Sequence, residues 1–182
     1  MAFDVSKFRS NMIGDGARPN LFEVSLTFPT YVTGASESST QTSFMAKSAQ
    51  LPGSSIGTVP IFYFGRELKF AGNRTFADWS IQIINDEDFK IRNSLENWMN
   101  AINSHEGNIR SGNASSPTNY TVDASVNQYG KGGKENVLKS YTFVGLFPID
   151  ISPIDLDWSS NDTIEEYSVT FAYQYWTSNS TS

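Results

Sequence analysis

Apolar and polar residues alternate along much of this chain of 182 residues, and the alternation restricts the possible folds more than any other feature. In residues 21–28 every second residue is apolar, and the same period of two runs through residues 165–176. Because successive side chains of a β-strand point to opposite faces, these segments predict strands with one buried face. Residues 75–84, 120–129 and 137–146 carry patterns of the same kind. We therefore expect a fold built mainly from antiparallel strands.

One segment, residues 86–105, follows a helical period instead. Its apolar residues fall at spacings of four, three and four: Ile91, Leu95, Trp98 and Ile102. This spacing predicts a single amphipathic helix with one apolar stripe. The acidic residues 86–88 at its start suit the positive end of the helix dipole, and Gly107 suits its termination.

Residues 58–71 differ from the other strand patterns because both of their faces are apolar. We expect this hairpin-like region to be covered on both sides. Three stretches rich in small polar residues or glycine are expected to be loops: residues 30–42, 107–119 and 130–135. Since no shift in composition marks a boundary, we expect one α+β domain over residues 1–182, with a polar tail at residues 177–182.

The residue counts exclude several kinds of site. The chain has no Cys, so disulfides, thiolate zinc sites, iron–sulfur clusters and thiol nucleophiles are excluded. It has one His, His105, which is too few for a three-histidine metal site. No apolar run approaches the ~20 residues of a membrane span, and residues 1–9 lack the apolar core of a secretory signal. We expect a soluble protein made in a cytoplasm, with no membrane anchor.

The negative charge lies at one end of the chain. The formal net charge is −6, and no Lys or Arg follows Lys139. Six acidic residues remain in that last part: Asp150, Asp155, Asp157, Asp162, Glu165 and Glu166. An acidic chain is a poor match for stable nucleic-acid binding, which needs clustered Lys and Arg to displace counterions from phosphates.

The motifs that suggest chemistry are incomplete. Residues 130–134 are glycine- and lysine-rich but lack the phosphate-loop spacing, and a strand pattern follows them. Asp155, Asp157, Asn161 and Asp162 match only part of a calcium loop. The acidic residues 86–88 are better explained as a helix start than as a hydrolase site. We expect no enzyme activity, no cofactor and no metal.

Three kinds of protein remain open on pattern alone. Strands with two apolar faces, and a long strand at residues 165–176, favour a protein that pairs its sheet edges with identical copies in a ring. A monomeric β-sandwich would bury the same residues in its own interior. Such a sandwich could bind carbohydrate through exposed aromatic platforms such as Trp158 and Trp176, and an acidic-site hydrolase is a third alternative.

Several short segments lie in order along nearly the whole chain. The first, residues 17–22, precedes the first strand pattern, and others cover residues 51–52, 71–79, 85–87, 145–148, 156–161 and 172–176. Together these segments resemble the tail tube proteins of contractile-tailed bacteriophages of the T-even type. The motif positions that the resemblance places at subunit or ring contacts are Arg18, Pro19, Asn20, Leu21, Phe22, Arg74, Asp78, Trp79, Asp157 and Trp158. Residues 30–42, 107–119 and 177–182 depart from the shorter family pattern.

The resemblance implies an antiparallel β-barrel or sandwich with one flanking helix, assembled as a hexameric ring. Rings of this family stack into a tube inside a contractile sheath, and the genome passes through the lumen into the host. The implied partners are further copies of the chain, the sheath, baseplate and terminator proteins, and DNA in transit. The implied location is the virion, after assembly in the host bacterial cytoplasm. A tube of a related injection or type VI secretion system, with protein as cargo, is the alternative.

Two sets of residues receive expected positions in such a tube. The helix stripe is expected to face the sheath or the core. Asp150, Asp155, Asp162, Glu165 and Glu166 are expected at an acidic lumen or an interface, where they would repel DNA phosphates rather than hold them.

Overall fold

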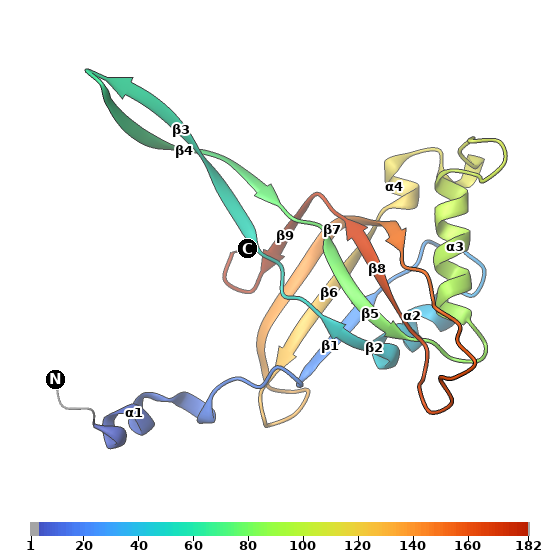
Figure 1. Ribbon diagram of the computed structural model, residues 1–182, viewed down its shortest axis with the longest axis horizontal. Helices are drawn as coiled ribbons and strands as arrows, with labels where there is room; N and C mark the ends of the chain where they lie inside the picture. Colours follow the sequence, from blue (N-terminus) through green and yellow to red (C-terminus); the bar gives the residue numbers. More distant parts are fainter. Residues whose placement is uncertain (1–3, 182) are drawn as a thin grey trace.

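The computed structural model describes residues 4–181, which form a strongly curved antiparallel sheet, a separate long hairpin and a few helices (Figure 1). The strands are β1 Phe22–Leu26, β2 Ala46–Ala49, β3 Ser54–Tyr63, β4 Arg66–Phe76, β5 Trp79–Ile84, β6 Val122–Tyr129, β7 Val137–Ile151, β8 Glu166–Ala172 and β9 Tyr175–Ser178. The α-helices are α1 Val5–Asn11, α2 Ala35–Met45, α3 Lys90–Ile102 and α4 Pro117–Tyr120. Short 3₁₀ turns lie at Ile13–Asp15 and Gly112–Ala114.

The main sheet is antiparallel, as expected, but it is not a closed barrel. Its strand order is β1-β6-β7-β8-β5-β2, and β9 also pairs with β7. Strand β7 belongs to both halves of the sheet: its first part pairs with β6 and β9, and its last part pairs with β8. Gly145, at a positive φ of 67°, lies at the junction. Since β1 and β2 form the two ends of the strand order, the expected barrel closure does not occur within one chain.

The core lies between the two halves of the curved sheet and under α3. Trp79 of β5 stacks on Phe143 of β7 with 4.3 Å between ring centroids, so the two halves face each other across the core. Trp98 of α3 lies edge-on to Phe28 at 5.8 Å. The largest fully buried side chains are Trp79, Trp98, Phe143, Phe171, Leu26, Ile81, Ile83, Leu95, Leu146, Val24, Val126 and Val169. The alternation in the sequence therefore predicted the inward face of these strands.

The amphipathic helix exists, but it is shorter than residues 86–105. Helix α3 begins at Lys90, because Phe89 before it has a left-handed φ of 51°, and it ends at Ile102 before the extended Asn103. The acidic residues 86–88 therefore precede the helix, where Asp86 accepts a hydrogen bond from Gln41 of α2. Ile91, Leu95 and Trp98 are buried and Ile102 packs partly against them, so the stripe faces the core.

The prediction of a loop at residues 30–42 is wrong, because α2 occupies most of the segment. This second helix has no apolar stripe and lies across α3 through small polar side chains. The Ser38 and Ser94 hydroxyls share a hydrogen bond of 2.8 Å, and the Thr42 hydroxyl donates to the Ser38 carbonyl at 2.7 Å. The Ser38–Ser94 bond joins α2 to α3, the Thr42 bond lies within α2, and Ala35 and Met45 of α2 pack against the core.

Three other boundaries differ from the sequence predictions. Residues 165–176 form two strands, β8 and β9, which are interrupted at residues 173–174. Residues 107–119 contain the 3₁₀ turn, whose Ala114 is buried, and the start of α4. The polar tail is partly structured, since Thr177 and Ser178 belong to β9 and Ser178 is buried.

Candidate assembly surfaces

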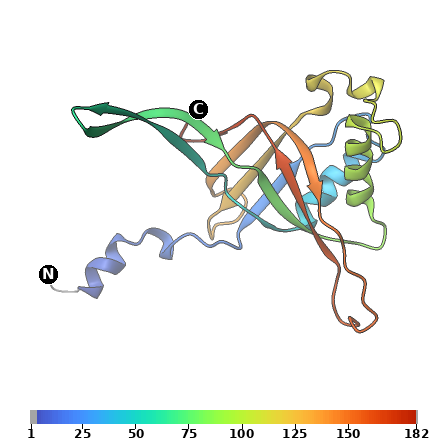
Figure 2. The same ribbon diagram turned by 45° about the horizontal axis from the view of Figure 1, so that its top comes forward.

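The β3–β4 hairpin projects from the body as a two-stranded sheet of its own (Figures 1 and 2). Every residue of β3 is exposed, and so are nine of the eleven residues of β4. The expectation that this region is covered on both sides is therefore wrong for a single chain. Its exposed apolar side chains are Ile56, Val59, Ile61, Phe62, Tyr63, Phe64, Leu68 and Phe70. Isolated hairpins of this kind are marginally stable in water, so this one needs a partner.

The turn at the hairpin tip is unusual in its residue types. Phe64 and Gly65 both have positive φ, 47° and 78°, as the residues of a type I′ turn do. That turn ordinarily takes Asn or Gly at both positions, and a left-handed conformation costs other residues roughly 1–2 kcal/mol. Phe64 is also 92% exposed, and its ring contact within the chain is with its neighbour Tyr63. The tip therefore combines an exposed aromatic side chain with an unfavourable backbone conformation.

The base of the hairpin is fixed to the body, and a bulge separates base from tip. Phe76 lies edge-on to Trp176 of β9 at 6.3 Å, and the Trp176 indole donates to the Gly53 carbonyl at 3.2 Å. The strand register shifts between Ile56 and Thr58. A Cβ at Gly72 would lie 3.0 Å from the carbonyl oxygen of Gly57, so the two glycines allow the backbones to approach at this bulge.

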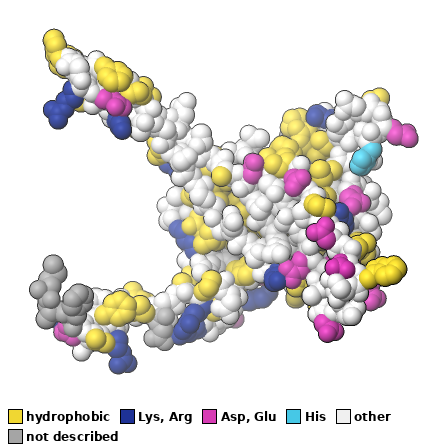
Figure 3. All heavy atoms as spheres, viewed as in Figure 1, with side chains coloured by type: hydrophobic (Ala, Val, Ile, Leu, Met, Phe, Trp, Pro, Cys, Tyr) yellow, Lys and Arg dark blue, Asp and Glu magenta, His cyan; other side chains and the backbone are white. Residues whose placement is uncertain are grey.

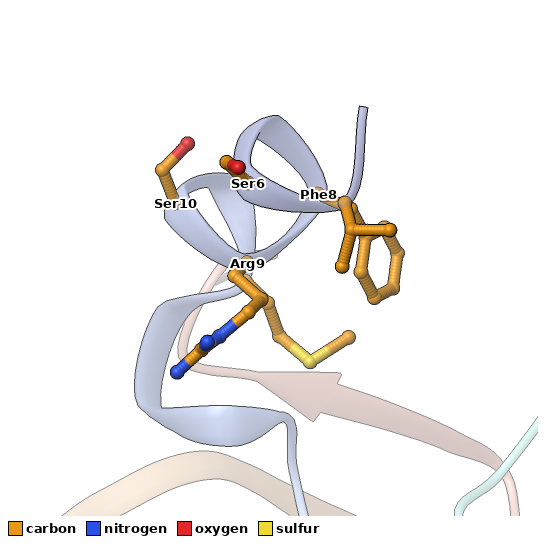
Figure 4. A pocket seen from close by; sticks show the side chains of 6 residues that line it. Ser6, Phe8, Arg9 and Ser10 are labelled. Carbon is orange, nitrogen blue, oxygen red and sulfur yellow. The ribbon is translucent and has the colours of Figure 1, made fainter. Parts of the chain in front are cut away.

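The N-terminal segment forms a second arm on the same side of the body as the hairpin (Figure 1). All residues of α1 are exposed, and Phe8 projects from one side of the helix while Ser10 projects from the other (Figure 4). Val5, Phe8 and Met12 leave an uncovered apolar face. Sequence reasoning missed this arm, although its apolar residues fall at helical spacing.

The segment that joins this arm to the sheet contains the first group of motif residues. Arg18, Pro19 and Asn20 are exposed, and Leu21 and Phe22 are half-buried where β1 begins. The amide N–H of Tyr129 donates to the Leu21 carbonyl at 2.8 Å, which attaches this segment to β6.

A polar cluster ties the start of β1 to the glycine-rich turn of residues 130–135. The Lys134 ammonium and the Tyr129 hydroxyl each donate to the Glu23 carboxylate at 2.5 Å. These bonds hold the pKa of Glu23 below its usual value, with Lys134 the larger cause, and Glu23 in turn raises the pKa of Tyr129. The turn thus joins β6 to β7, as predicted, and its lysine neutralises a carboxylate.

The C-terminal acids divide into two groups. Glu165 accepts from the Asn85 amide at 2.9 Å, and Glu166 pairs with Lys47 at 2.5 Å and accepts from Gln82 at 2.8 Å. These two half-buried carboxylates stabilise the sheet. Asp150 at the end of β7 is exposed, and so are Asp155 and Asp162 in the loop of residues 152–165 between β7 and β8.

The remaining motif residues have different environments. Trp79 is a core residue whose indole donates to the Gln50 carbonyl at 2.8 Å. Asp78 is exposed just before it, and exposed Arg74 donates to the Ser54 hydroxyl at 3.1 Å across the hairpin. Asp157 and Trp158 lie in the β7–β8 loop, far along the sheet from the others (Figure 1). The structure therefore does not gather the ten motif positions into one site.

Two kinds of feature are absent from the described residues: a group of metal-binding side chains and a membrane-spanning helix. Across residues 4–181, no group of three or more His, Asp or Glu side chains is arranged to hold a metal ion. In the same part of the chain, no helix is long and apolar enough to cross a membrane.

The charges on one face are separated along the molecule (Figure 3). Basic side chains accompany the apolar ones on the two arms, whereas most of the acidic side chains in this view lie over the opposite part. The two arms expose apolar surface and the two sheet ends expose unpaired strand edges, as protein–protein contact surfaces do.

Comparison with known proteins agrees with this view and confirms the resemblance seen in the sequence. Residues 17–179 match the family described as phage tail tube protein. The chain is 33% identical to tail tube protein gp19 of Enterobacteria phage T4 over 163 residues, which cover 90% of this chain and 92% of that protein. It is 28% identical to the tail tube protein of Serratia phage KSP90, over 93% of each chain.

Solved structures support the fold. The cap that terminates the tube of the anti-feeding prophage is similar, with a TM-score of 0.64 and 17% identity over 90% of this chain and 91% of that one. One chain in the sheath–tube complex of an extracellular contractile injection system, PVC, is also similar. The match covers 98% of this chain and 99% of that chain, with a TM-score of 0.60 and 14% identity. Because the sequence match spans nearly the whole chain and the fold agrees with it, this protein belongs to the phage tail tube protein family, the structural tube proteins of contractile phage tails.

Proposed function

We propose that six copies of this chain close into a ring, and that rings stack into the inner tube through which the genome enters the host cell. The observation that carries this proposal is the β3–β4 hairpin, whose two apolar faces are uncovered in the single chain. Burying its exposed apolar side chains against neighbouring copies would contribute a favourable hydrophobic term to assembly.

The ends of the sheet support ring closure. Strands β1 and β2 each pair on one side only, which leaves backbone N–H and C=O groups at both ends of the strand order. Pairing or covering these edges with an adjacent copy removes the risk of uncontrolled edge-to-edge association. A cyclic arrangement of identical chains does so for every copy.

The role is structural, with no catalysis and no cofactor. The motif residues from Arg18 to Phe22 contribute to subunit contacts beside the N-terminal arm. The polar outer face of α3, opposite its buried stripe, is available to the sheath, and the tube ends contact baseplate and terminator proteins. Assembly takes place in the host cytoplasm before the tube becomes part of the virion.

DNA is the cargo that the similarities favour. The relatives above 30% identity are phage proteins, whereas the injection-system structures share only the fold. A net charge of −6 per chain disfavours retention of DNA in the lumen. Passage without binding is what a conduit requires.

Electron microscopy of the purified protein tests this function. We expect rings or tubes for the unmodified chain. Asp substitutions at Ile61 and Phe62, made separately, probe the two faces of the hairpin, because neighbouring strand residues point to opposite sides. Each substitution is expected to abolish rings or tubes, since it would bury a carboxylate in an apolar contact.

Ile109→Asp is the matched control. Ile109 is an exposed apolar residue in the loop after α3, away from the hairpin and the sheet ends. This variant should assemble normally. A strictly monomeric unmodified protein at high concentration would contradict the proposed function, and normal assembly of both hairpin variants would contradict the role given to the hairpin.

A further inference from the structure

The hairpin tip has a specific chemical character beyond being apolar. Tyr63 and Phe64 lie edge-to-face with 4.5 Å between their rings, and both are exposed. Arg66 and Lys69 follow on β4 with Glu67 between them, and all three are exposed. The tip therefore offers an aromatic pair and a net charge of +1 from two cations and one carboxylate.

The loop of residues 152–165 between β7 and β8, here called the acidic loop, offers the opposite combination. Trp158 is 98% exposed, and Leu156 and Ile164 are also open to solvent. Asp155, Asp157 and Asp162 are exposed among them, and the loop has no basic residue. The same segment lines a hollow of about 570 Å³.

The carboxylates of this loop are suited to attract cations. Asp157 accepts from the Ser159 amide N–H at 2.9 Å and from the Ser159 hydroxyl at 2.8 Å. These bonds hold the pKa of Asp157 below its usual value, with the amide the larger cause. The turn that they form also presents Trp158 outward, because Asp157 and Ser159 hold the backbone on either side of it.

The two surfaces lie on opposite sides of the molecule. The hairpin leaves the body on one side, and the acidic loop projects on the other (Figure 2). A chain therefore cannot dock its own tip on its own loop. Contact between one end of a copy and the opposite end of the next is heterologous, and it repeats from copy to copy in a fixed direction.

We propose that the hairpin tip of one copy docks on the acidic loop of a second copy in the adjoining ring. The tip aromatics enter the hollow beside Trp158, and Arg66 on one face of the hairpin and Lys69 on the other approach the loop carboxylates from two sides. This inference rests on the proposed function, since it names the partner of the hairpin within the tube. It also gives the tube a polarity, because tip and loop differ in chemistry.

Charge reversal with complementation tests the docking. One variant carries Arg66→Glu and Lys69→Glu, and another carries Asp155→Lys and Asp162→Lys. Sedimentation of tubes, with negative-stain images of the supernatant, separates stacked from unstacked rings. We expect each variant to lose about tenfold or more of its pelleted tube, because several identical contacts act together across one ring interface.

Complementation supplies the decisive comparison. An equimolar mixture of the two variants, or one chain with all four changes, restores opposite charges across the contact and should recover tubes. Glu87→Lys with Glu106→Lys is the control, because these exposed acids lie outside both surfaces. That variant should stack like the unmodified protein.

The outcomes distinguish this inference from the proposed function. Normal stacking of the loop variant, or failure of both the mixture and the four-change chain to recover tubes, overturns the docking even if the unmodified protein forms tubes. Absence of rings from the unmodified protein would instead refute the proposed function itself.

Discussion

Replacement of Trp98 by Ala tests the view that α3 belongs to the core. Trp98 is fully buried, lies edge-on to Phe28 and close to Phe171, and its indole donates to the Tyr120 carbonyl at 2.8 Å. A Trp of this kind buries ~150–250 Å², which at ~25 cal/mol per Å² corresponds to about 4–6 kcal/mol as an upper estimate. Measured Trp→Ala costs of about 3–5 kcal/mol lead us to expect a loss of about 4 kcal/mol.

Urea unfolding followed by far-ultraviolet circular dichroism measures this loss at a concentration where the chain is monomeric. Trp158→Ala is the matched control, because the same substitution at a 98% exposed site should change the free energy of unfolding by within about 0.5 kcal/mol. If Trp98→Ala prevents folding, Trp98→Phe gives a readable result. The Phe side chain keeps an aromatic ring in the core but removes the donor to the Tyr120 carbonyl. We expect this to lower the free energy of unfolding by about 1–2 kcal/mol. Equal effects at Trp98 and Trp158 would refute the burial assigned to α3.

Two further predictions concern the sheet and the hairpin. Because Lys134 and Tyr129 lower the folded-state pKa of Glu23, this carboxylate stabilises the fold above its unfolded pKa, and the stabilisation is lost as the pH falls through the folded value. Glu23→Gln should therefore flatten the fall of the melting temperature between about pH 5 and pH 3, and an unchanged pH profile would contradict this. Gly72→Ala should disrupt tubes while the monomer keeps its melting temperature, because its Cβ would press on the Gly57 carbonyl at the base of a projecting hairpin. Gly53→Ala, which meets no atom within 4 Å, should leave both properties unchanged, and equal effects at Gly53 and Gly72 would rule out the bulge as the cause.

The sequence predicted the elements whose periodicity reflects burial. The alternation in β1, β5 and β8 and the stripe on α3 identify side chains that the core encloses, because burial of one face selects apolar residues at that spacing. Helix α2 was not predicted, because its buried face is polar. Its buried side chains, Ser38 and Thr42, are hydroxyls that are satisfied by hydrogen bonds and leave no apolar pattern.

The break between β8 and β9, inside a periodic segment, was also not predictable from the sequence. The interval between β8 and β9 continues the alternation of residues 165–176 without interruption, yet the strand ends there. At this point the backbone N–H of Gln174 donates to the Val144 carbonyl at 3.0 Å, next to Gly145 of β7 with its positive φ. Such a long-range backbone contact has no local signature.

The assembly surfaces were only partly predictable. Two apolar faces in residues 58–71 indicated that something must cover the hairpin, but not that the cover lies outside the chain. Trp158 was identified through a motif and as an aromatic platform, whereas its position opposite the hairpin depends on the fold.

The uncovered hairpin has a thermal consequence for the tube. Its apolar side chains are exposed in the free chain. If the proposed stacking removes them from water, assembly should have a negative heat-capacity change and a favourable entropy near room temperature. Hydrophobic association weakens on cooling. Tubes that persist in warm buffer should therefore shorten in the cold. The lowest temperature at which the tube stays assembled would then depend on the hairpin, a segment that adds almost nothing to the stability of the monomer.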